Sequence, residues 1–95
     1  MLDRRAKLTS ALHELAAEYF NRETNRQSLI TVTSVTLKDE GRTAIIAISV
    51  LPDDKAAAAL DFAHRQLSGL RGYMMENLRA RHIPWLEVVL SGQKQ

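Results

Sequence analysis

Three histidines and a pair of adjacent aspartates are the side chains of this sequence best suited to catalysis or metal binding. His13, His64 and His82 fall in three separate segments, and none stands at a metal-ligand or catalytic-triad spacing from a carboxylate. Asp53 and Asp54 lie at the start of a predicted helix, where an N-cap role explains them. No phosphate loop, dinucleotide fingerprint or nucleophile elbow occurs. We therefore expect no enzyme activity, no cofactor and no metal site.

A stretch near the C-terminus, SGLRGYMMENLRARHIPWLEVVL over residues 68–90, combines glycines with arginines in a pattern suited to binding an anion. Gly69 and Gly72 interrupt a sequence otherwise typical of a helix, where each glycine costs about 0.5–1 kcal/mol relative to alanine. One interpretation is that the glycines serve close packing between helices. The other is that the helix breaks at Gly69, so that a phosphate reaches the unpaired amides of the next helix and the Arg71 guanidinium. The residues by themselves leave both interpretations open.

The bulk composition bounds the size and class of the protein. The 95 residues suit one small domain, residues 1–95, and residues 91–95 are expected to form a flexible tail. The net charge of +2 is too small to imply a nucleic-acid partner by itself. The absence of cysteine fits a reducing compartment and excludes disulfides. No apolar run approaches the roughly 20 residues of a membrane span, and residues 1–5 carry no signal-peptide core. We expect a cytoplasmic protein without a membrane partner.

The N-terminal half of the sequence predicts a helix followed by a β-hairpin. Residues 3–26 carry one apolar stripe at helical spacing, built from Leu8, Leu12, Leu15 and Tyr19 and widened by Ala16 and Phe20. Residues 29–38 and 43–51 are rich in β-branched side chains and predict two strands, joined by a glycine-containing turn. In the first strand the apolar residues change face near Thr33–Ser34. A β-bulge there would return Ile30, Val32, Val35 and Leu37 to one side.

The C-terminal half predicts two helices and a last strand. Residues 55–67 contain five alanines and should form a helix with Leu60, Ala63 and Leu67 on its buried side. We expect this helix to break at Ser68–Gly69 and a second helix to run from Leu70, with Met74 and Leu78 in register, and to stop before Pro84. Residues 86–90 then alternate as a strand.

The predicted order of elements is α-β-β-α-α-β. A helix pair joins the second and third strands, so these two strands can run parallel with a right-handed crossover. All helices would then cover one face of a three-stranded mixed sheet, which makes an α+β, two-layer domain.

Residues 4 to about 90 resemble ribosome-binding factor A, a family of small-subunit assembly factors with a type II KH-like fold. The resemblance lies in the segments ALHELAAEYFNRE, LITVTSVTLKDEGRTAIIAISVL and LSGLRGYMMENLRARHIPWLEVVL. In the family, a kinked Ala-x-Gly between two helices replaces the Gly-x-x-Gly loop of KH domains, and Ser68 and Gly69 occupy the matching positions. Leu67 departs from the expected alanine, and His64 and Trp85 are further departures.

The resemblance implies binding to the immature small (30S) ribosomal subunit and its ribosomal RNA during late maturation and rRNA processing. The residues that we expect to contact RNA are Ser68, Gly69, Arg71, Gly72, Arg65, Arg79, Arg81, Arg4 and Arg5. Arginine makes up nine of the thirteen basic residues and suits phosphate recognition. Few exposed aromatic side chains are expected to stack on bases, so RNA would be recognised by shape and backbone. We expect Phe62, Tyr73 and Trp85 in the core or at its edge, and of these three Trp85 is the most open to exposure. We expect a monomer with no small-molecule substrate.

Two other functions stay open at the level of the sequence. The face of the second strand that carries Ile45 and Ala47 is apolar enough to bind a protein partner or a second copy of the chain. A small enzyme of another type is the remaining alternative, which the scattered histidines disfavour.

Overall fold

The computed structural model describes residues 4–23, 28–79 and 82–91. Its elements are α1 (Arg4–Glu23), β1 (Leu29–Lys38), β2 (Thr43–Leu51), the 3-10 turn η1 (Asp53–Lys55), α2 (Ala56–Arg65), α3 (Leu67–Asn77) and β3 (Trp85–Leu90). The predicted order α-β-β-α-α-β is therefore confirmed.

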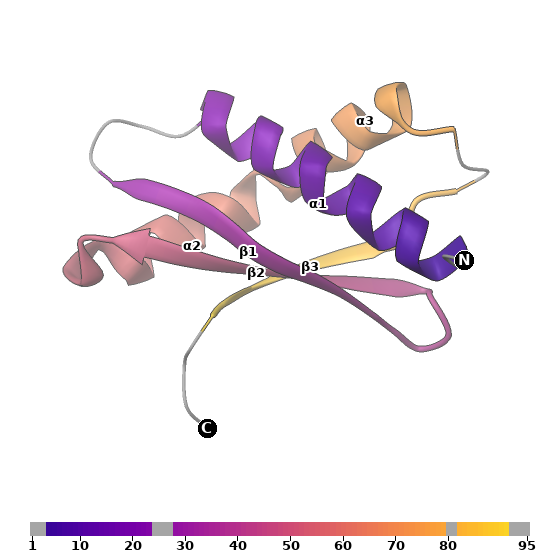
Figure 1. Cartoon of the computed structure of the whole chain (residues 1–95). Coiled ribbons are helices and arrows are strands. Elements are labelled where there is room, and N and C mark those ends of the chain that lie inside the picture. Colours follow the sequence, from indigo (N-terminus) through magenta and orange to yellow (C-terminus); the bar gives the residue numbers. More distant parts are fainter. Residues whose placement is uncertain (1–3, 24–27, 80–81, 92–95) are drawn as a thin grey trace.

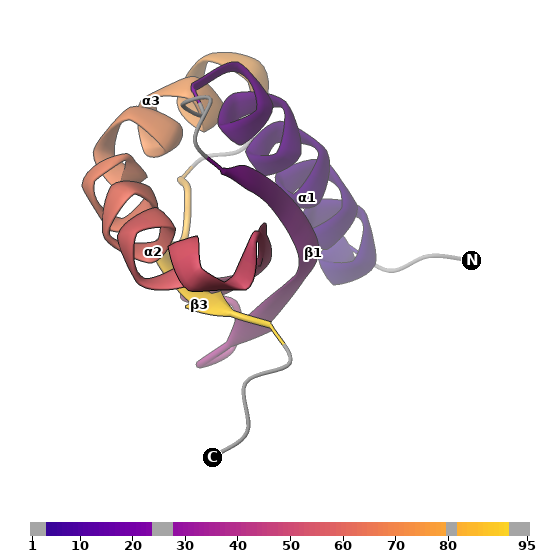
Figure 2. The same ribbon diagram turned by 90° about the vertical axis from the view of Figure 1, so that its left-hand side faces the viewer.

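The sheet has the strand order β1-β2-β3, with β1 and β2 antiparallel and β2 and β3 parallel, as predicted. The α2–α3 pair makes the crossover between the two parallel strands. α1 lies across β1 and beside α3, and α2 packs on β2 and β3 (Figure 1). In the turned view of Figure 2, α1, α3 and α2 lie side by side over the same face of the sheet. The fold is thus the α+β, two-layer arrangement expected from the sequence.

The β-bulge predicted near Thr33–Ser34 is confirmed. The register of β1 on β2 shifts between Val32 and Ser34, and Thr33 Oγ1 donates a hydrogen bond to the carbonyl of Ala47 at 3.1 Å. The extra residue restores the alternation of the strand, so the apolar side chains on both sides of the bulge turn toward the helices. The residues brought to this face are Ile30, Val32, Val35 and Leu37.

The core lies between this face of the sheet and the helices. Its largest fully buried side chains are Phe20, Leu12, Ile46, Ile48, Leu70 and Met74. Burying an apolar side chain of this size contributes about 1.5–3 kcal/mol, which is why these positions fix the orientation of each element. In α1 the buried line runs through Leu12, Ala16 and Phe20, while Leu8 and Tyr19 from the predicted stripe are only half-buried.

The junction between α2 and α3 lies at Gln66, so the predicted break at Ser68–Gly69 is wrong. Gln66 has φ −89° and ψ −3°, and its amide is shared between the carbonyls of Phe62 and Ala63, both at 3.1 Å. The hydroxyl of Tyr19 donates a hydrogen bond to Oε1 of Gln66 at 2.9 Å. A contact from α1 therefore holds the residue at which the chain turns, and Ser68 and Gly69 fall inside the first turn of α3.

Two other predicted helix ends differ from the structure. Pro52 and Lys55 occupy the N-cap positions of η1 and α2, and neither gives a side-chain cap, so the N-cap role predicted for Asp53 and Asp54 is wrong. Both carboxylates still lie in the first turn of η1, where negative charge is favourable. At the other end of the pair, Leu78 is extended, with φ −125° and ψ 127°, and does not continue α3.

Candidate nucleic-acid interface

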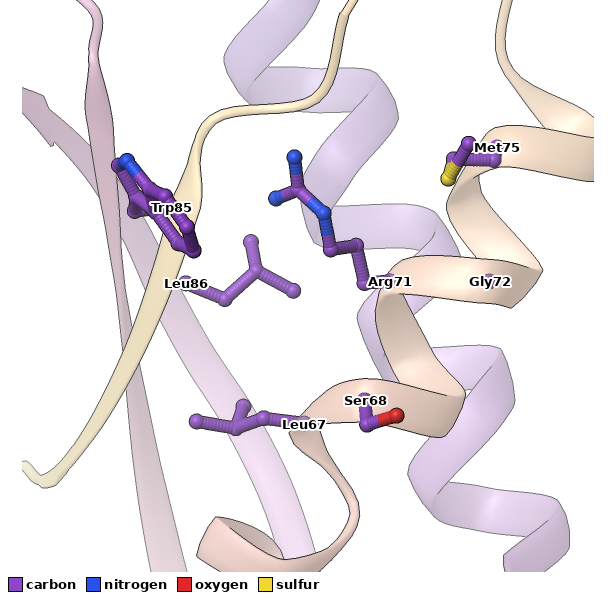
Figure 3. A pocket seen from close by; sticks show the side chains of 7 residues that line it. All are labelled: Leu67, Ser68, Arg71, Gly72, Met75, Trp85 and Leu86. Atoms are coloured by element: carbon purple, nitrogen blue, oxygen red, sulfur yellow. The ribbon is translucent and has the colours of Figure 1, made fainter.

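A hollow of about 330 Å³ lies between α3 and the start of β3. Figure 3 shows Leu67 and Ser68 at its foot, Met75 and Gly72 on α3, and Trp85 and Leu86 on β3. Its full lining is Leu67, Ser68, Arg71, Gly72, Met75, Trp85 and Leu86. The parallel crossover creates this arrangement, because it brings α3 back to the edge strand that follows it in sequence. Apart from Ser68 and Arg71, the walls are apolar or glycine.

Two large apolar side chains of this hollow face solvent. Trp85 is 72% exposed, so the core or core-edge position expected of it is wrong, although it was the aromatic residue considered most open to exposure. Met75 is 64% exposed. Gly72 stands on the same helix as Met75, and a Cβ added to it would meet no atom within 4 Å. Exposed apolar side chains that gather around a concavity mark a binding surface more often than scattered ones do.

Arg71 is the charged group of the hollow, and its position is fixed by two contacts. Nη1 donates a hydrogen bond to the carbonyl of Pro84 at 2.6 Å. Cζ lies 5.3 Å from the ring centroid of Trp85, which is a cation–π distance. A guanidinium has five N–H donors, so the bond to Pro84 leaves most of them for an anion. Arg71 is thus a preorganised cation at the mouth of an apolar hollow (Figure 3).

A second hollow, of about 260 Å³, adjoins the first and shares Arg71 and Trp85 with it. Its other lining residues are Arg42, His82 and Ile83. Arg42 follows the β1–β2 turn, and its carbonyl accepts a hydrogen bond from the amide of Trp85 at 2.9 Å. The parallel pairing of β2 and β3 thereby places two arginines and an imidazole around one concavity.

The structure brings together only part of the predicted RNA-binding set. Ser68, Arg71 and Gly72 line the same hollow. Gly69 instead faces α1, because a Cβ added to it would overlap the hydroxyl of Tyr19. This geometry supports the helix-packing interpretation for Gly69, and the open surroundings of Gly72 support a surface role.

The remaining predicted arginines lie on other parts of the fold. Arg65 is exposed at the end of α2, and Arg79 is exposed beyond the end of α3. Arg4 and Arg5 are exposed in the first turn of α1. Arg81 lies outside the described residues. None of the four described arginines lines either hollow.

Sequence reasoning missed Arg42, His82, Met75 and Leu86 as members of the site. Arg42 and His82 are distant in the sequence, and only the pairing of strands brings them to one concavity. The predicted parallel pairing of the second and third strands was the available signal. It places the start of β2 beside the start of β3, and therefore Arg42 beside Trp85.

The candidate catalytic side chains are not brought together. His64 on α2 is exposed, and its Nε2 lies 3.2 Å from the carbonyl oxygen of Val88, while His82 lines the second hollow. Within residues 4–23, 28–79 and 82–91, no cluster of three or more acidic, histidine or cysteine side chains is placed to hold a metal ion. In the same part of the chain, no helix combines the length and apolar character needed to cross a bilayer.

A separate polar cluster joins α1 and α3 at a distance along the helices from Arg71. The hydroxyl of Tyr73 donates a hydrogen bond to Oε1 of Glu18 at 2.8 Å, and Arg22 Cζ lies 5.3 Å from the ring centroid of Tyr73. The bond to the Glu18 carboxylate, with desolvation, raises the pKa of Tyr73 above its usual 10.0, against an opposing effect of Arg22. The cluster ties the two helices together.

Comparison with protein-family models gives no match, and comparison with curated protein sequences gives none either. Solved structures do match. The crystal structure of ribosome-binding factor A from Thermus thermophilus aligns with a TM-score of 0.81 and 22% identity, over 95% of this chain and 98% of that one. The solution structure of a Thermotoga maritima protein, provisionally designated ribosome-binding factor A, aligns with a TM-score of 0.76 and 21% identity, over 95% of this chain and 90% of that one.

A third match comes from a study of a ribosomal complex. A homology model of Thermus thermophilus ribosome-binding factor A, fitted into a cryo-electron-microscopy map of its complex with the 30S subunit, aligns with a TM-score of 0.70 and 24% identity, over 90% of this chain and 88% of that one. The likeness covers nearly the whole length of each chain. This chain therefore has the fold of ribosome-binding factor A.

Proposed function

We propose that this chain is a ribosome-binding factor A that binds the immature small (30S) ribosomal subunit and its ribosomal RNA. The role would fall in late maturation and rRNA processing, in the cytoplasm, and would involve no catalysis. The fold likeness over 95% of the chain supports the family, and one of the similar proteins has been fitted into a map of its 30S complex.

The observation that carries the RNA-binding part of the proposal is the environment of Arg71. Its guanidinium is anchored on Pro84 and Trp85, and among the described residues no carboxylate forms an ion pair with it. It stands beside Arg42 and His82 at an open surface. A fixed cation with free donors, flanked by a second arginine, suits the phosphates of a nucleic acid.

The proposed RNA-binding surface centres on Ser68, Arg71 and Gly72. Arg65 and Arg79 would extend it along the helix pair, because both are exposed on either side of α3. Arg4 and Arg5, and also Arg81 outside the described residues, are proposed as peripheral contacts. Gly69 would act indirectly, by allowing α3 to pack on Tyr19.

The test is co-sedimentation of the purified protein with small ribosomal subunits on a sucrose gradient. We expect wild-type protein to travel with free small subunits, and the Arg71→Glu variant to be lost from that fraction. Lys55→Glu is the matched control, because Lys55 is exposed in η1 and the substitution changes the charge by the same amount. Circular dichroism should show the same helix content for all three proteins. Co-sedimentation of Arg71→Glu at the wild-type level would contradict the proposal.

A protein–protein function is the second candidate, and the open face of the sheet favours it. Leu29 and Leu51 are direct cross-strand partners and are 54% and 61% exposed, and Val89 on β3 is 42% exposed. Ile45 and Ala47, the residues on which the sequence suggested this alternative, are half-buried on β2. A monomer that binds RNA through Arg71 has no need of this face, so substitutions on it separate the two functions.

A further inference from the structure

A groove lies between α1 and the outer edge of β1. The strand order β1-β2-β3 makes β1 an edge strand, and it runs beside α1 on the side of the domain away from α2 (Figure 2). The volume of this α1–β1 groove is about 340 Å³. Its lining consists of Ala17, Glu18 and Asn21 from α1 and of Leu29, Ile30, Thr31 and Val32 from β1. None of these residues lines the two hollows beside Arg71.

The α1–β1 groove follows the main chain of β1 rather than one face of the sheet. Successive side chains of a strand point to opposite faces, so a concavity lined by consecutive residues runs along the edge of the strand. In an antiparallel pair, every second residue turns its N–H and C=O groups away from the partner strand. Among the described residues, no main-chain hydrogen bond from outside the β1–β2 pair reaches Leu29–Val32. The groove therefore presents main-chain donors and acceptors that an added strand can pair.

The rest of β1 is less suited to pairing with another strand. The register of β1 on β2 shifts at Thr33, directly after the groove, and Lys38 places a charge at the end of the strand. Bulges and lysines are two of the features by which edge strands avoid pairing with other chains. Leu29–Val32 has no charge, no proline and no bulge. The edge that is open to pairing is therefore short and coincides with the groove.

We propose that the α1–β1 groove binds an extended peptide segment of a partner protein, which adds as a short strand along Leu29–Val32 and places a lysine or arginine beside Glu18. Addition of a strand to an exposed sheet edge is a recurring mode of peptide recognition, in which main-chain hydrogen bonds give affinity and side-chain contacts give specificity. This interaction goes beyond the proposed function and uses a surface separate from Arg71.

The charge of Glu18 determines the kind of peptide. Glu18 is exposed, and its Oε1 accepts a hydrogen bond from the neutral hydroxyl of Tyr73 at 2.8 Å. Arg22 lies over the ring of Tyr73, and among the described residues no cation forms an ion pair with Glu18. A basic side chain of the bound segment would therefore meet an acidic group that has no ionic partner, and such complementarity favours one register over others.

A second copy of this chain fits the α1–β1 groove less well than a basic peptide does. Its own Leu29–Val32 segment has no basic side chain to place beside Glu18. Two copies paired about a two-fold axis through this segment would also bring both Glu18 carboxylates to the same interface, where like charges repel. The charge of the groove thus favours a segment of another protein.

The first test is selection of peptides on the wild-type protein. The probe is a displayed library of random peptides of about eight residues, within the usual length of a strand. We expect enrichment of sequences that combine β-branched or aromatic residues with one lysine or arginine. A dye-labelled synthetic copy of an enriched peptide then gives the affinity by anisotropy. Failure to enrich any sequence over an uncoated surface would overturn the inference.

Methylation of the peptide main chain tests strand addition directly. A strand bound along one edge turns alternate N–H groups toward β1 and the others toward solvent. Methylation of one alternating set of peptide nitrogens should weaken binding roughly ten-fold, because it removes the main-chain hydrogen bonds, and methylation of the other set should have little effect. Equal effects of the two sets would exclude pairing with the edge of β1.

Substitutions of the α1 wall locate the peptide. Ala17→Leu places a larger side chain in the groove and should weaken binding roughly ten-fold. Ala57→Leu is the matched control, because Ala57 is exposed on α2, outside the groove. Circular dichroism checks each variant for wild-type helix content. Arg71→Glu should bind the peptide like the wild type, and weaker binding in that variant would contradict a separate surface.

The charge contact is tested by a milder substitution that keeps the fold. Glu18→Gln retains an acceptor for Tyr73 and removes the charge, so it should weaken binding about three-fold. Glu76→Gln is the matched control, because Glu76 is exposed on α3 and lies outside the groove. The effect of Glu18→Gln should disappear for a peptide in which norleucine replaces the basic residue.

Two further outcomes would overturn the inference. Wild-type affinity in both Ala17→Leu and Glu18→Gln would place the peptide outside the α1–β1 groove. A wild-type dimer in sedimentation equilibrium that Ala17→Leu dissociates would show that a second copy of the chain, and not a partner protein, occupies the groove.

Discussion

The hydroxyl of Tyr19 on α1 occupies the space that a Cβ of Gly69 on α3 would need. The same hydroxyl donates a hydrogen bond to Oε1 of Gln66, and the centroid of the Tyr19 ring lies 5.7 Å from that of Tyr73. Glycine at residue 69 is therefore explained by the approach of two helices, with its backbone in an ordinary helical conformation. Gly72, one turn further on, has no such neighbour.

The two glycines should respond in opposite ways to alanine. We expect Gly69→Ala to lower the free energy of unfolding by about 1 kcal/mol, because displacing Tyr19 breaks its hydrogen bond and its packing, which outweighs the gain in helix propensity. We expect Gly72→Ala to raise it by about 0.5–1 kcal/mol, since the added Cβ meets nothing and alanine favours the helix. Urea unfolding followed by circular dichroism measures both. Equal effects of the two substitutions would refute the assigned roles.

The role of the Tyr19 hydroxyl can be tested by making Gly69→Ala both in the wild type and in the Tyr19→Phe variant. Removal of the hydroxyl takes away the atom nearest to the added Cβ, so Gly69→Ala should cost less in Tyr19→Phe than in the wild type. A double-mutant cycle in urea gives this coupling. An unchanged cost would show that the hydroxyl is not what restricts residue 69.

The phenol of Tyr73 should titrate above its usual pKa of 10.0. The hydrogen bond to the Glu18 carboxylate is the largest cause of the shift, and Arg22 acts in the opposite direction. Glu18→Gln should therefore lower the pKa of Tyr73, and Arg22→Gln should raise it further. Ultraviolet absorbance titration resolves this group, because the chain has two tyrosines and Tyr19→Phe removes the other. A rise in Glu18→Gln would contradict the assigned cause.

The raised pKa of Tyr73 also predicts a dependence of stability on pH. The folded protein holds the phenolic proton more tightly than the unfolded chain, so the stabilisation is complete below pH 10 and is lost as the pH rises through the unfolded and then the folded pKa. The free energy of unfolding of Tyr73→Phe should fall less over this alkaline window than that of the wild type. Urea unfolding on both sides of pH 10 measures the difference, and identical pH profiles would count against it.

Binding of RNA should depend steeply on salt, and Arg71 should account for part of the slope. For single-stranded nucleic acid, each phosphate contact contributes about 0.7 to the slope of log affinity against log salt concentration. We expect Arg71→Gln to reduce the slope for oligoadenylate by about that amount, and Lys55→Gln to leave it unchanged. Anisotropy titrations over a series of potassium chloride concentrations supply the slopes. An unaltered slope in Arg71→Gln would exclude a phosphate contact at this residue.

The open face of the sheet should be dispensable for binding the small subunit. Leu51→Lys and Val89→Lys place a charge on exposed positions of β2 and β3, away from both hollows. Under the proposed function, both variants co-sediment with small subunits like the wild type, and the wild type is a monomer by sedimentation equilibrium. Loss of co-sedimentation, or a dimer that these substitutions dissociate, would favour the protein–protein function.

The helices, the strands and their order could be predicted from local patterns in the sequence. Residues 29–38 and 43–51 are strands with the predicted bounds, because β-branched residues and a glycine-containing turn act within a few residues of each other. The bulge at Thr33–Ser34 could also be predicted. The apolar residues of a half-buried strand should all lie on one face, so a change of face along the strand indicates one extra residue. Of the three aromatic residues expected in the core or at its edge, Trp85 was the one considered most open to exposure, and it is exposed.

The position of the turn between α2 and α3 could not be predicted from local sequence patterns. Glycine is the strongest local helix breaker in this segment, so the sequence points to Gly69, whereas the chain turns at Gln66. The deciding contact comes from Tyr19, which is 47 residues away from Gln66 and reaches Gln66 and Gly69 only after α1 packs on α3. Local propensity yields to such packing wherever a side chain from another element fills the space.

The sequence by itself thus determined the class of fold, the strands and bulge, and the choice of Arg71 as a candidate site residue, because each depends on neighbours in the chain. The tertiary structure alone decided that Gly69 serves helix packing, and that Arg42, Arg71, His82 and Trp85 share one surface. The physical reason is the parallel crossover. It brings the start of β2, the middle of α3 and the start of β3 to one place, although these segments are distant in sequence.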